Sequence, residues 1–212
     1  DNNIAIGKTA MGGADVAGSS NIAIGRAAMD ALTSGVSNIG LGPNALGQST
    51  TGCCNIALGN GALGGSDTTG SNNIALGYAA ADELLAGACN VALGHNALGA
   101  ATVANRSVAI GEGAMSGVTT GVAHDNIAIG RSALTGGAST SGACNVVIGV
   151  TAGDAITTGA CNVVMGLDSY SAATTGGQNV AIGHAAIGTG ITTGAGNVAV
   201  GRSSAAALTS GS

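Results

Sequence analysis

The chain repeats a five-residue pattern in which a polar residue is followed by aliphatic and small residues in alternation. In its clearest form the pattern reads Asn55, Ile56, Ala57, Leu58 and Gly59. Large aliphatic residues take the second and fourth places and a small residue takes the third, which is the period of two that is typical of a β-strand. The sequence therefore predicts a short strand in each copy, with a bend at the glycine.

The pattern recurs about twelve times, at intervals of 17 to 19 residues. Its closing glycines are Gly7, Gly25, Gly42, Gly59, Gly77, Gly94, Gly111, Gly130, Gly149, Gly166, Gly183 and Gly201. A period this short and regular is typical of a solenoid, and it is too short for helical repeats, which need about 33 residues or more. The sequence predicts an all-β chain, with 1–212 forming a single parallel β-solenoid domain of about twelve coils.

Each coil can be numbered from its asparagine, which is position 0. Positions 1 to 3 are the strand, and positions 7 and 8 form a second apolar segment, such as Ala62 and Leu63. Position 5 is often polar or charged, as at Arg26, which predicts a solvated corner. A turn rich in threonine and glycine, such as 157–159, then closes the coil.

The larger aliphatic residues at positions 1 and 3 are predicted to fill the core and to stack from coil to coil. This core ladder contains Ile56, Leu58, Ile74, Leu76, Val91, Leu93, Ile127 and Ile129. The small residues at position 2 would then form an outward strip that is too large to be left without a partner. Its members include Ala57, Ala75, Ala92, Ala109, Ala128 and Ala181. The sequence thus predicts a homotrimer packed through position 2; in the alternative arrangement, position 2 faces the interior and the larger aliphatics face the partners.

The asparagine and glycine that frame each strand are predicted to be structural. The asparagines are expected to stack as a ladder of amides, as in cross-β assemblies. These framing residues include Asn55, Asn73, Asn90, Asn126, Gly59, Gly77, Gly94 and Gly130.

The repeated unit resembles the head repeats of YadA-like trimeric autotransporter adhesins over nearly the whole chain. Similar motifs with a Thr-Thr-Gly turn, as at 68–70, also occur in phage tail-fibre repeats, although the coils are longer here than in the adhesins. The resemblance implies a left-handed parallel β-roll with three chains to a head. It also implies an extracellular place, on a cell surface or a virion fibre, and a host surface or a glycan as ligand.

Composition narrows the function classes. The chain has 40 glycines, a net charge of −5 and five basic residues, so we expect no nucleic-acid partner. It contains no run of 18 apolar residues, and we expect no membrane span in this segment. Because neither end carries an atypical capping repeat, we expect a segment of a longer fibre protein.

The cysteines mark one column of the predicted solenoid. Cys54, Cys89, Cys144 and Cys161 each directly precede position 0, and Cys53 precedes Cys54. Cys144 and Cys161 lie on adjacent coils, within reach of a disulfide, but stacked side chains that point in parallel favour free thiols over a bridge. We expect these thiols to be mostly buried.

No catalytic, cofactor or metal residues are predicted. Gly59, Gly61 and Gly64 match a dinucleotide-binding pattern, but no helical pattern follows them. His95 and His184 lie at the polar corner, and they are the candidate residues for an alternative function as an acyltransferase-like trimer.

An ice- or glycan-binding solenoid is a further alternative. It is suggested by the threonine column at Thr157, Thr174, Thr192 and Thr209. The preferred interpretation is a non-enzymatic, structural or adhesive fibre module, a rigid rod that presents or spaces a binding surface.

Overall fold

The computed structural model describes residues 2–13, 16–117, 124–136, 141–188 and 193–206. Over these residues the chain is all-β, and its twelve parallel strands form a β-solenoid, which confirms the predicted fold class. Each strand covers positions 1 to 3 of one coil. The strands are β1 (Ile4–Ile6), β2 (Ile22–Ile24), β3 (Ile39–Leu41), β4 (Ile56–Leu58), β5 (Ile74–Leu76), β6 (Val91–Leu93), β7 (Val108–Ile110), β8 (Ile127–Ile129), β9 (Val146–Ile148), β10 (Val163–Met165), β11 (Val180–Ile182) and β12 (Val198–Val200).

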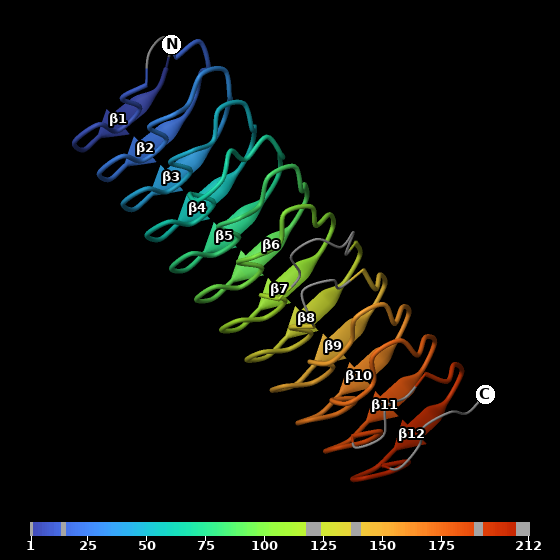
Figure 1. Cartoon of the computed structure of the whole chain (residues 1–212). Coiled ribbons are helices and arrows are strands. Elements are labelled where there is room, and N and C mark those ends of the chain that lie inside the picture. Colours follow the sequence, from blue (N-terminus) through green and yellow to red (C-terminus); the bar gives the residue numbers. More distant parts are fainter. Residues whose placement is uncertain (1, 14–15, 118–123, 137–140, 189–192, 207–212) are drawn as a thin grey trace. The chain divides into compact units, whose positions relative to one another are not determined.

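The chain divides into two compact units, Asp1–Asn105 and Arg106–Ser212. That 1–212 forms a single solenoid domain stays a prediction. The first unit holds β1 to β6 and the second holds β7 to β12. Within each unit, consecutive strands lie side by side in parallel (Figure 1). The pairing is in direct register, so equivalent positions of neighbouring coils are partners, as in the pair Ala57 and Ala75.

In β2 to β12, position 2 lines the interior of its unit while positions 1 and 3 point outward; in β1 all three strand residues are exposed. Ala75 is 0% exposed, whereas its neighbours Ile74 and Leu76 are 37% and 36% exposed. The prediction that the core ladder is buried is therefore wrong, although its stacking in register is confirmed. Ile74, Leu76 and Ile127 are exposed, and Ile56, Leu58, Val91, Leu93 and Ile129 are half-buried.

The physical reason is the small space inside a coil. The inner face of the strand lies directly against the second apolar segment, so it has room only for short side chains. A methyl group added at Gly40, which is position 2 of its coil, would lie 3.1 Å from Met29 Cε and 3.2 Å from the carbonyl oxygen of Ala45. Larger aliphatic side chains on this face would push the two layers of backbone apart.

The same orientation overturns the predicted trimer interface through position 2. The side chains assigned to that interface are fully covered within a single chain, so they cannot contact a partner. They are Ala57, Ala75, Ala92, Ala109, Ala128 and Ala181, each at most 1% exposed. The alternative orientation, with position 2 inside, is the one that the structure adopts.

Bulky core residues come from position 8 instead. Met29, Leu63 and Leu98 are buried there, each at 0% exposure. In the ninth coil a larger side chain at position 2 accompanies a smaller residue at position 8. This coil has the larger Val147 at position 2 and glycine at position 8, where a methyl group added to Gly153 would lie 3.2 Å from Val147 Cγ1. This exchange keeps the core filled, as close packing requires.

Hydrogen bonds between coils continue beyond the strands. In the fifth coil, the backbone N–H of Gly77 donates to the Leu58 carbonyl at 2.8 Å, and that of Ala79 donates to the Asn60 carbonyl at 3.0 Å. Positive φ angles recur at positions 4, 6 and 8 and at the residue before position 0, which gives each coil its tight corners. Position 6 accepts alanine at φ 50 in Ala79, and position 8 accepts leucine at φ 55 in Leu98.

Shortening a position 8 side chain should therefore cost far more stability than shortening a strand side chain. We expect Leu98→Ala to lower the free energy of unfolding by about 2–5 kcal/mol, because it leaves a cavity in the core. Ala81 occupies the same position with φ 52, so the backbone accepts alanine there. Leu76→Ala removes the same atoms from the outer face and should cost about 1 kcal/mol or less in a single chain. Urea unfolding at concentrations where the chain is monomeric measures both changes, and equal losses there would contradict the assigned orientation.

Candidate interaction surface

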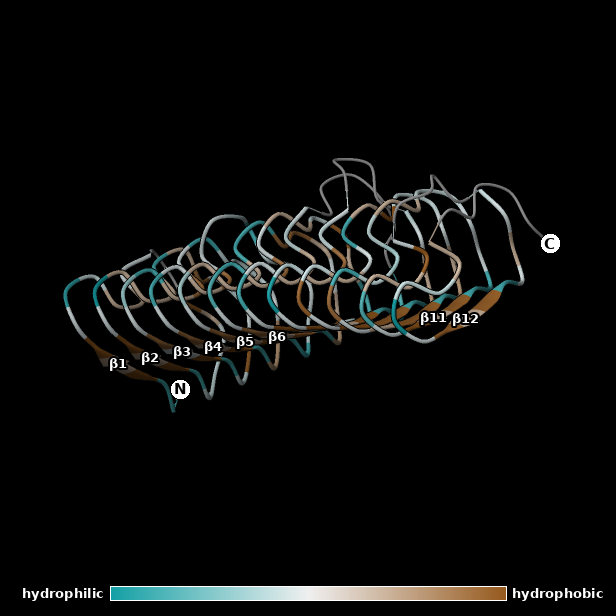
Figure 2. Cartoon of the chain, turned by 90° about the horizontal axis from the view of Figure 1, so that it is seen from below, coloured by the Kyte–Doolittle hydropathy of each residue, from teal (hydrophilic) through white to brown (hydrophobic). Residues whose placement is uncertain are grey.

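The outward side chains of the strands form an apolar surface on each unit. Positions 1 and 3 carry only isoleucine, leucine, valine or methionine in β1 to β12. We call this surface, made of positions 1 and 3 of β1–β6 in the first unit and of β7–β12 in the second, the aliphatic face. Figure 2 colours the strands that carry this face as hydrophobic.

The aliphatic face is large for a surface in contact with water. Each unit contributes twelve side chains, and those of Ile74, Leu76, Ile127 and Met165 are 36–38% exposed. Single soluble proteins rarely expose one contiguous apolar patch larger than a few hundred Å², so continuous aliphatic columns along six strands are unusual for a surface without a partner. Because antiparallel and solvated strands normally place polar residues on their water-facing side, this face has the composition of an interface.

Exposed, more polar columns flank the aliphatic face. The residue before position 0 is exposed on one side, as at Ser37 and Asn72, and position 5 is exposed on the other, as at Arg26, Asn60 and His95. An apolar centre with a polar rim is the usual anatomy of a protein–protein interface.

The predicted ladder of asparagine amides is confirmed, and it lies inside the coils. Asn73 Nδ2 donates to Asn55 Oδ1 at 3.1 Å and to the Gly87 carbonyl at 2.9 Å, while its Oδ1 accepts from the backbone N–H of Asn90 at 3.0 Å. The same contacts recur in the second unit, where Asn145 Nδ2 donates to Asn126 Oδ1 at 3.2 Å and to the Gly159 carbonyl at 3.0 Å. Each amide thus satisfies buried backbone groups of its own coil and of the next one.

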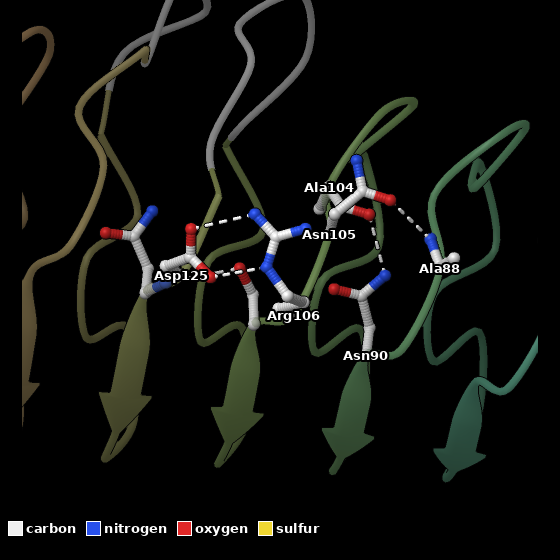
Figure 3. A network of polar contacts seen from close by, with 8 residues as sticks. Ala88, Asn90, Ala104, Asn105, Arg106 and Asp125 are labelled. Carbon is white, nitrogen blue, oxygen red and sulfur yellow. Dashed lines mark hydrogen bonds and ion pairs between the residues drawn. The ribbon is translucent and has the colours of Figure 1, made fainter.

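The ladder changes where Ser107 replaces the asparagine. In the second unit, Ser107 Oγ accepts from the backbone N–H of Asn126 at 3.3 Å. Beside it, Arg106 Nε and Nη2 donate to the two carboxylate oxygens of Asp125 at 2.7 and 2.9 Å, as Figure 3 shows. The Arg106 guanidinium holds the pKa of Asp125 below its usual range.

At the end of the first unit, side-chain amides bond to neighbouring backbone groups. Asn90 Nδ2 donates to the Ala104 carbonyl at 2.7 Å, and Asn105 Oδ1 accepts from the backbone N–H of Ala88 at 2.8 Å (Figure 3). These contacts are structural, since they satisfy backbone groups.

The histidines considered for acyl transfer lie at exposed corners. His95 stacks on Tyr78 with ring centroids 5.4 Å apart, and His184 is exposed at position 5 of its own coil in the second unit. The residues that follow Gly59, including Gly61 and Gly64, form turns rather than the helix that a dinucleotide site requires. Across the described residues, no group of three or more histidine, cysteine or acidic side chains is placed to hold a metal ion.

The threonines use their hydroxyl groups within the solenoid. Thr33 Oγ1 donates to the Thr50 carbonyl at 2.9 Å, and Thr157 Oγ1 donates to the Thr174 carbonyl at 3.0 Å. These bonds link the turns of adjacent coils, as local hydroxyl chemistry predicts. Thr192 and Thr209 lie outside the described residues.

A polar groove on the first unit is a smaller feature that sequence reasoning missed. It has a volume of about 370 Å³ and is lined by Ala27, Asp30, Asn44, Gly47, Gln48, Gly61, Gly64, Gly65 and Asp82. Partial burial, and then the nearby Glu83, raise the pKa of Asp82. The sequence does carry a signal for this groove. Three lining positions of one coil are glycine, Gly61, Gly64 and Gly65, and the lack of side chains there leaves the groove open.

The cysteines are more exposed than the sequence predicts. Cys54, Cys89, Cys144 and Cys161 are free thiols as expected, but they are exposed rather than buried, and Cys53 is half-buried. The reason is the backbone: the residue before position 0 lies at a tight corner outside the strand, with φ of 58° to 61° at these four cysteines, and its side chain meets solvent.

Comparison with family models, curated proteins and solved structures finds no match for this chain. Among the residues that the structure describes, no helix is long and apolar enough to cross a membrane.

Proposed function

We propose that this chain is a non-enzymatic structural module of a fibre or adhesin, in which copies of the solenoid pack together through the aliphatic face. The observation that carries the proposal is the exposure of in-register aliphatic columns along every strand of both units. Packing them against another apolar surface would remove them from water, at about 25 cal/mol for each Å² buried.

A second copy of the chain fits this face better than an unrelated partner. Its own aliphatic columns have the same spacing of about 4.8 Å from coil to coil, so side chains of two copies can interdigitate along many coils. No charged side chain interrupts the strands, so association needs no buried ion pairs.

The resemblance to adhesin heads favours three copies and an extracellular place, on a cell surface or a virion fibre. In this arrangement the corners at position 5, including Arg26, His95 and Arg131, remain in contact with solvent and are available to a host surface or a glycan.

The alternative functions would use more limited features. Glycan binding would use the polar groove between Asp30 and Asp82, which occupies four coils of the first unit. Ice binding would use the threonine turns, where the hydroxyl groups of Thr33 and Thr157 already donate to carbonyls. The aliphatic face extends over every strand, so we place the function there.

The proposal predicts that charges on the aliphatic face separate the copies. In Leu58→Glu/Leu76→Glu, the dissociation constant of the assembly should rise at least about 100-fold, because association would bury unpaired carboxylates. The matched control is Asn60→Glu/Tyr78→Glu, which adds the same charges to the same two coils at position 5. Sedimentation velocity and mass photometry should find trimers for the wild type and this control, and a folded monomer for the first variant.

Two results would refute the proposal. One is a wild-type chain that stays monomeric at micromolar concentration. The other is an assembly that survives the charges at positions 58 and 76. Circular dichroism on each variant distinguishes dissociation from unfolding.

A further inference from the structure

One outward column of the solenoid carries four of the five thiols. It consists of the residue before position 0 in each coil, with Cys54 and Cys89 in the first unit and Cys144 and Cys161 in the second. All four side chains are exposed, and their φ angles lie between 58° and 61°. Their backbones are therefore equivalent, and what differs is the neighbour that each thiol meets in the column.

Cys144 and Cys161 are direct neighbours. They belong to consecutive coils, two residues before the paired strand positions Val146 and Val163, and the backbone N–H of Cys161 donates to the Ala143 carbonyl at 2.9 Å. Coil spacing places their Cα atoms about 4.8 Å apart, within the range of about 4.4–6.8 Å found in disulfides.

The neighbouring thiol also affects the pKa of Cys144. Desolvation raises that pKa most, and the adjacent Cys161 and Asp125 raise it further. The thiolate of Cys144 is therefore scarcer near neutral pH than that of an ordinary cysteine, and its reactivity should increase as the pH rises.

We infer that Cys144 and Cys161 form a redox-active pair, a modification site at which a small disulfide such as oxidised glutathione links two adjacent coils of the second unit. One cysteine thiolate attacks a sulfur of oxidised glutathione, which forms a mixed disulfide and releases one glutathione thiolate. The second cysteine thiolate attacks the protein sulfur of that mixed disulfide and releases the other glutathione. The protein loses two electrons, glutathione gains them, and the two protons leave the protein thiols for the glutathione thiolates.

The bond should be reversible. Stacked side chains hold their Cβ atoms near the coil spacing of about 4.8 Å, whereas a relaxed disulfide brings them to about 3.8 Å. Closing the bond therefore strains the coils locally, and a strained, exposed disulfide is easily reduced. A dithiol reductant should reopen it.

The chain contains its own matched controls. In the same column of the first unit, Asn72 lies on the coil between those of Cys54 and Cys89. On that side, each of these two thiols therefore has an asparagine as its neighbour instead of a thiol. They have the same exposure and backbone conformation as the pair. The variant Asn72→Cys places a thiol beside both and should create a second linkable pair.

The test is oxidation of the full chain with oxidised glutathione, followed by mass spectrometry and non-reducing peptide mapping. We expect the segments that contain residues 144 and 161 to become linked, with a loss of two thiols, release of two glutathiones and recovery on reduction. Cys144→Ser and Cys161→Ser should each abolish the link and retain one glutathione at the remaining cysteine. In Asn72→Cys a link from position 72 to 54 or 89 should appear.

The same link is expected in the variant Leu58→Glu/Leu76→Glu, so it does not depend on self-association. Stable glutathione adducts at both positions without the link would overturn the inference. So would chains joined to one another through these cysteines, or equal reactivity of Cys89 and the pair with no intrachain bond.

Discussion

Gly77→Ala is expected to destabilise the first unit by at least about 3 kcal/mol. Gly77 has φ +134, a region that residues with a side chain avoid at a cost of about 1–3 kcal/mol. A methyl group would also lie 2.5 Å from the carbonyl oxygen and 2.7 Å from the carbonyl carbon of Gly94 on the next coil. Relief of this contact requires two coils to separate, which weakens the hydrogen bonds between them. Urea unfolding followed by circular dichroism measures the loss.

Substitutions at two other glycines distinguish the two causes of that loss, backbone strain and the close contact with the next coil. Gly201 has a similar φ of +119 but nothing within 4 Å of an added methyl group, so Gly201→Ala should show backbone strain without the contact. Gly61 has φ +68 at position 6, where Ala27 and Ala79 adopt similar angles, so Gly61→Ala should change stability by less than about 1 kcal/mol. If Gly77→Ala behaved like Gly61→Ala, the close approach of the coils at position 4 would be refuted.

Asn73→Leu should lower the free energy of unfolding by about 3–5 kcal/mol. The substitution keeps a side chain of similar size but removes the donor to the Gly87 carbonyl and the acceptor of the Asn90 backbone N–H. It also removes one of the two acceptors of Asn90 Nδ2, which still donates to the Ala104 carbonyl. Each buried group left without a partner costs about 1–3 kcal/mol. Urea unfolding and amide hydrogen exchange at Asn90 would measure the effect, and exchange should accelerate there first.

Milder changes at neighbouring places provide the controls. Asn73→Ser should lose less stability, since Ser107 occupies the equivalent position and its Oγ accepts from the Asn126 N–H. Asn72→Ser should be nearly neutral, because Asn72 is exposed and Ser37 holds the same place with φ 57. A loss of less than 1 kcal/mol for Asn73→Leu would show that the amide ladder adds little stability.

The interior of this solenoid is unusual because amides and small residues fill much of it. Most coils place an asparagine and a small residue inside, as in Asn73 and Ala75, while Ile74 and Leu76 point to solvent. The hydrogen bonds of the amide ladder and the backbone hold neighbouring coils together. The larger aliphatics are thus left free for assembly, which is why we connect the aliphatic face with the function.

Several features follow from the sequence by itself. The recurrence of the motif every 17 to 19 residues gives the coil length, and alternation around Ala57 gives the strand. The presence of the same motif in every coil then gives the direct register and the stacking of Asn55 on Asn73, because parallel strands in consecutive coils pair at equivalent positions. Turn chemistry explains Thr157 without further information.

Which strand face is the interior was decided by the tertiary structure. A period of two shows that Ala75 and Ile74 point in opposite directions, but it does not tell which of the two points into the core. The outcome depends on the distance between the strand and the second apolar segment, where position 8 residues such as Met29 and Leu98 already fill the space. Because that distance admits only alanine, glycine or valine at position 2, the larger aliphatics are placed on the outside.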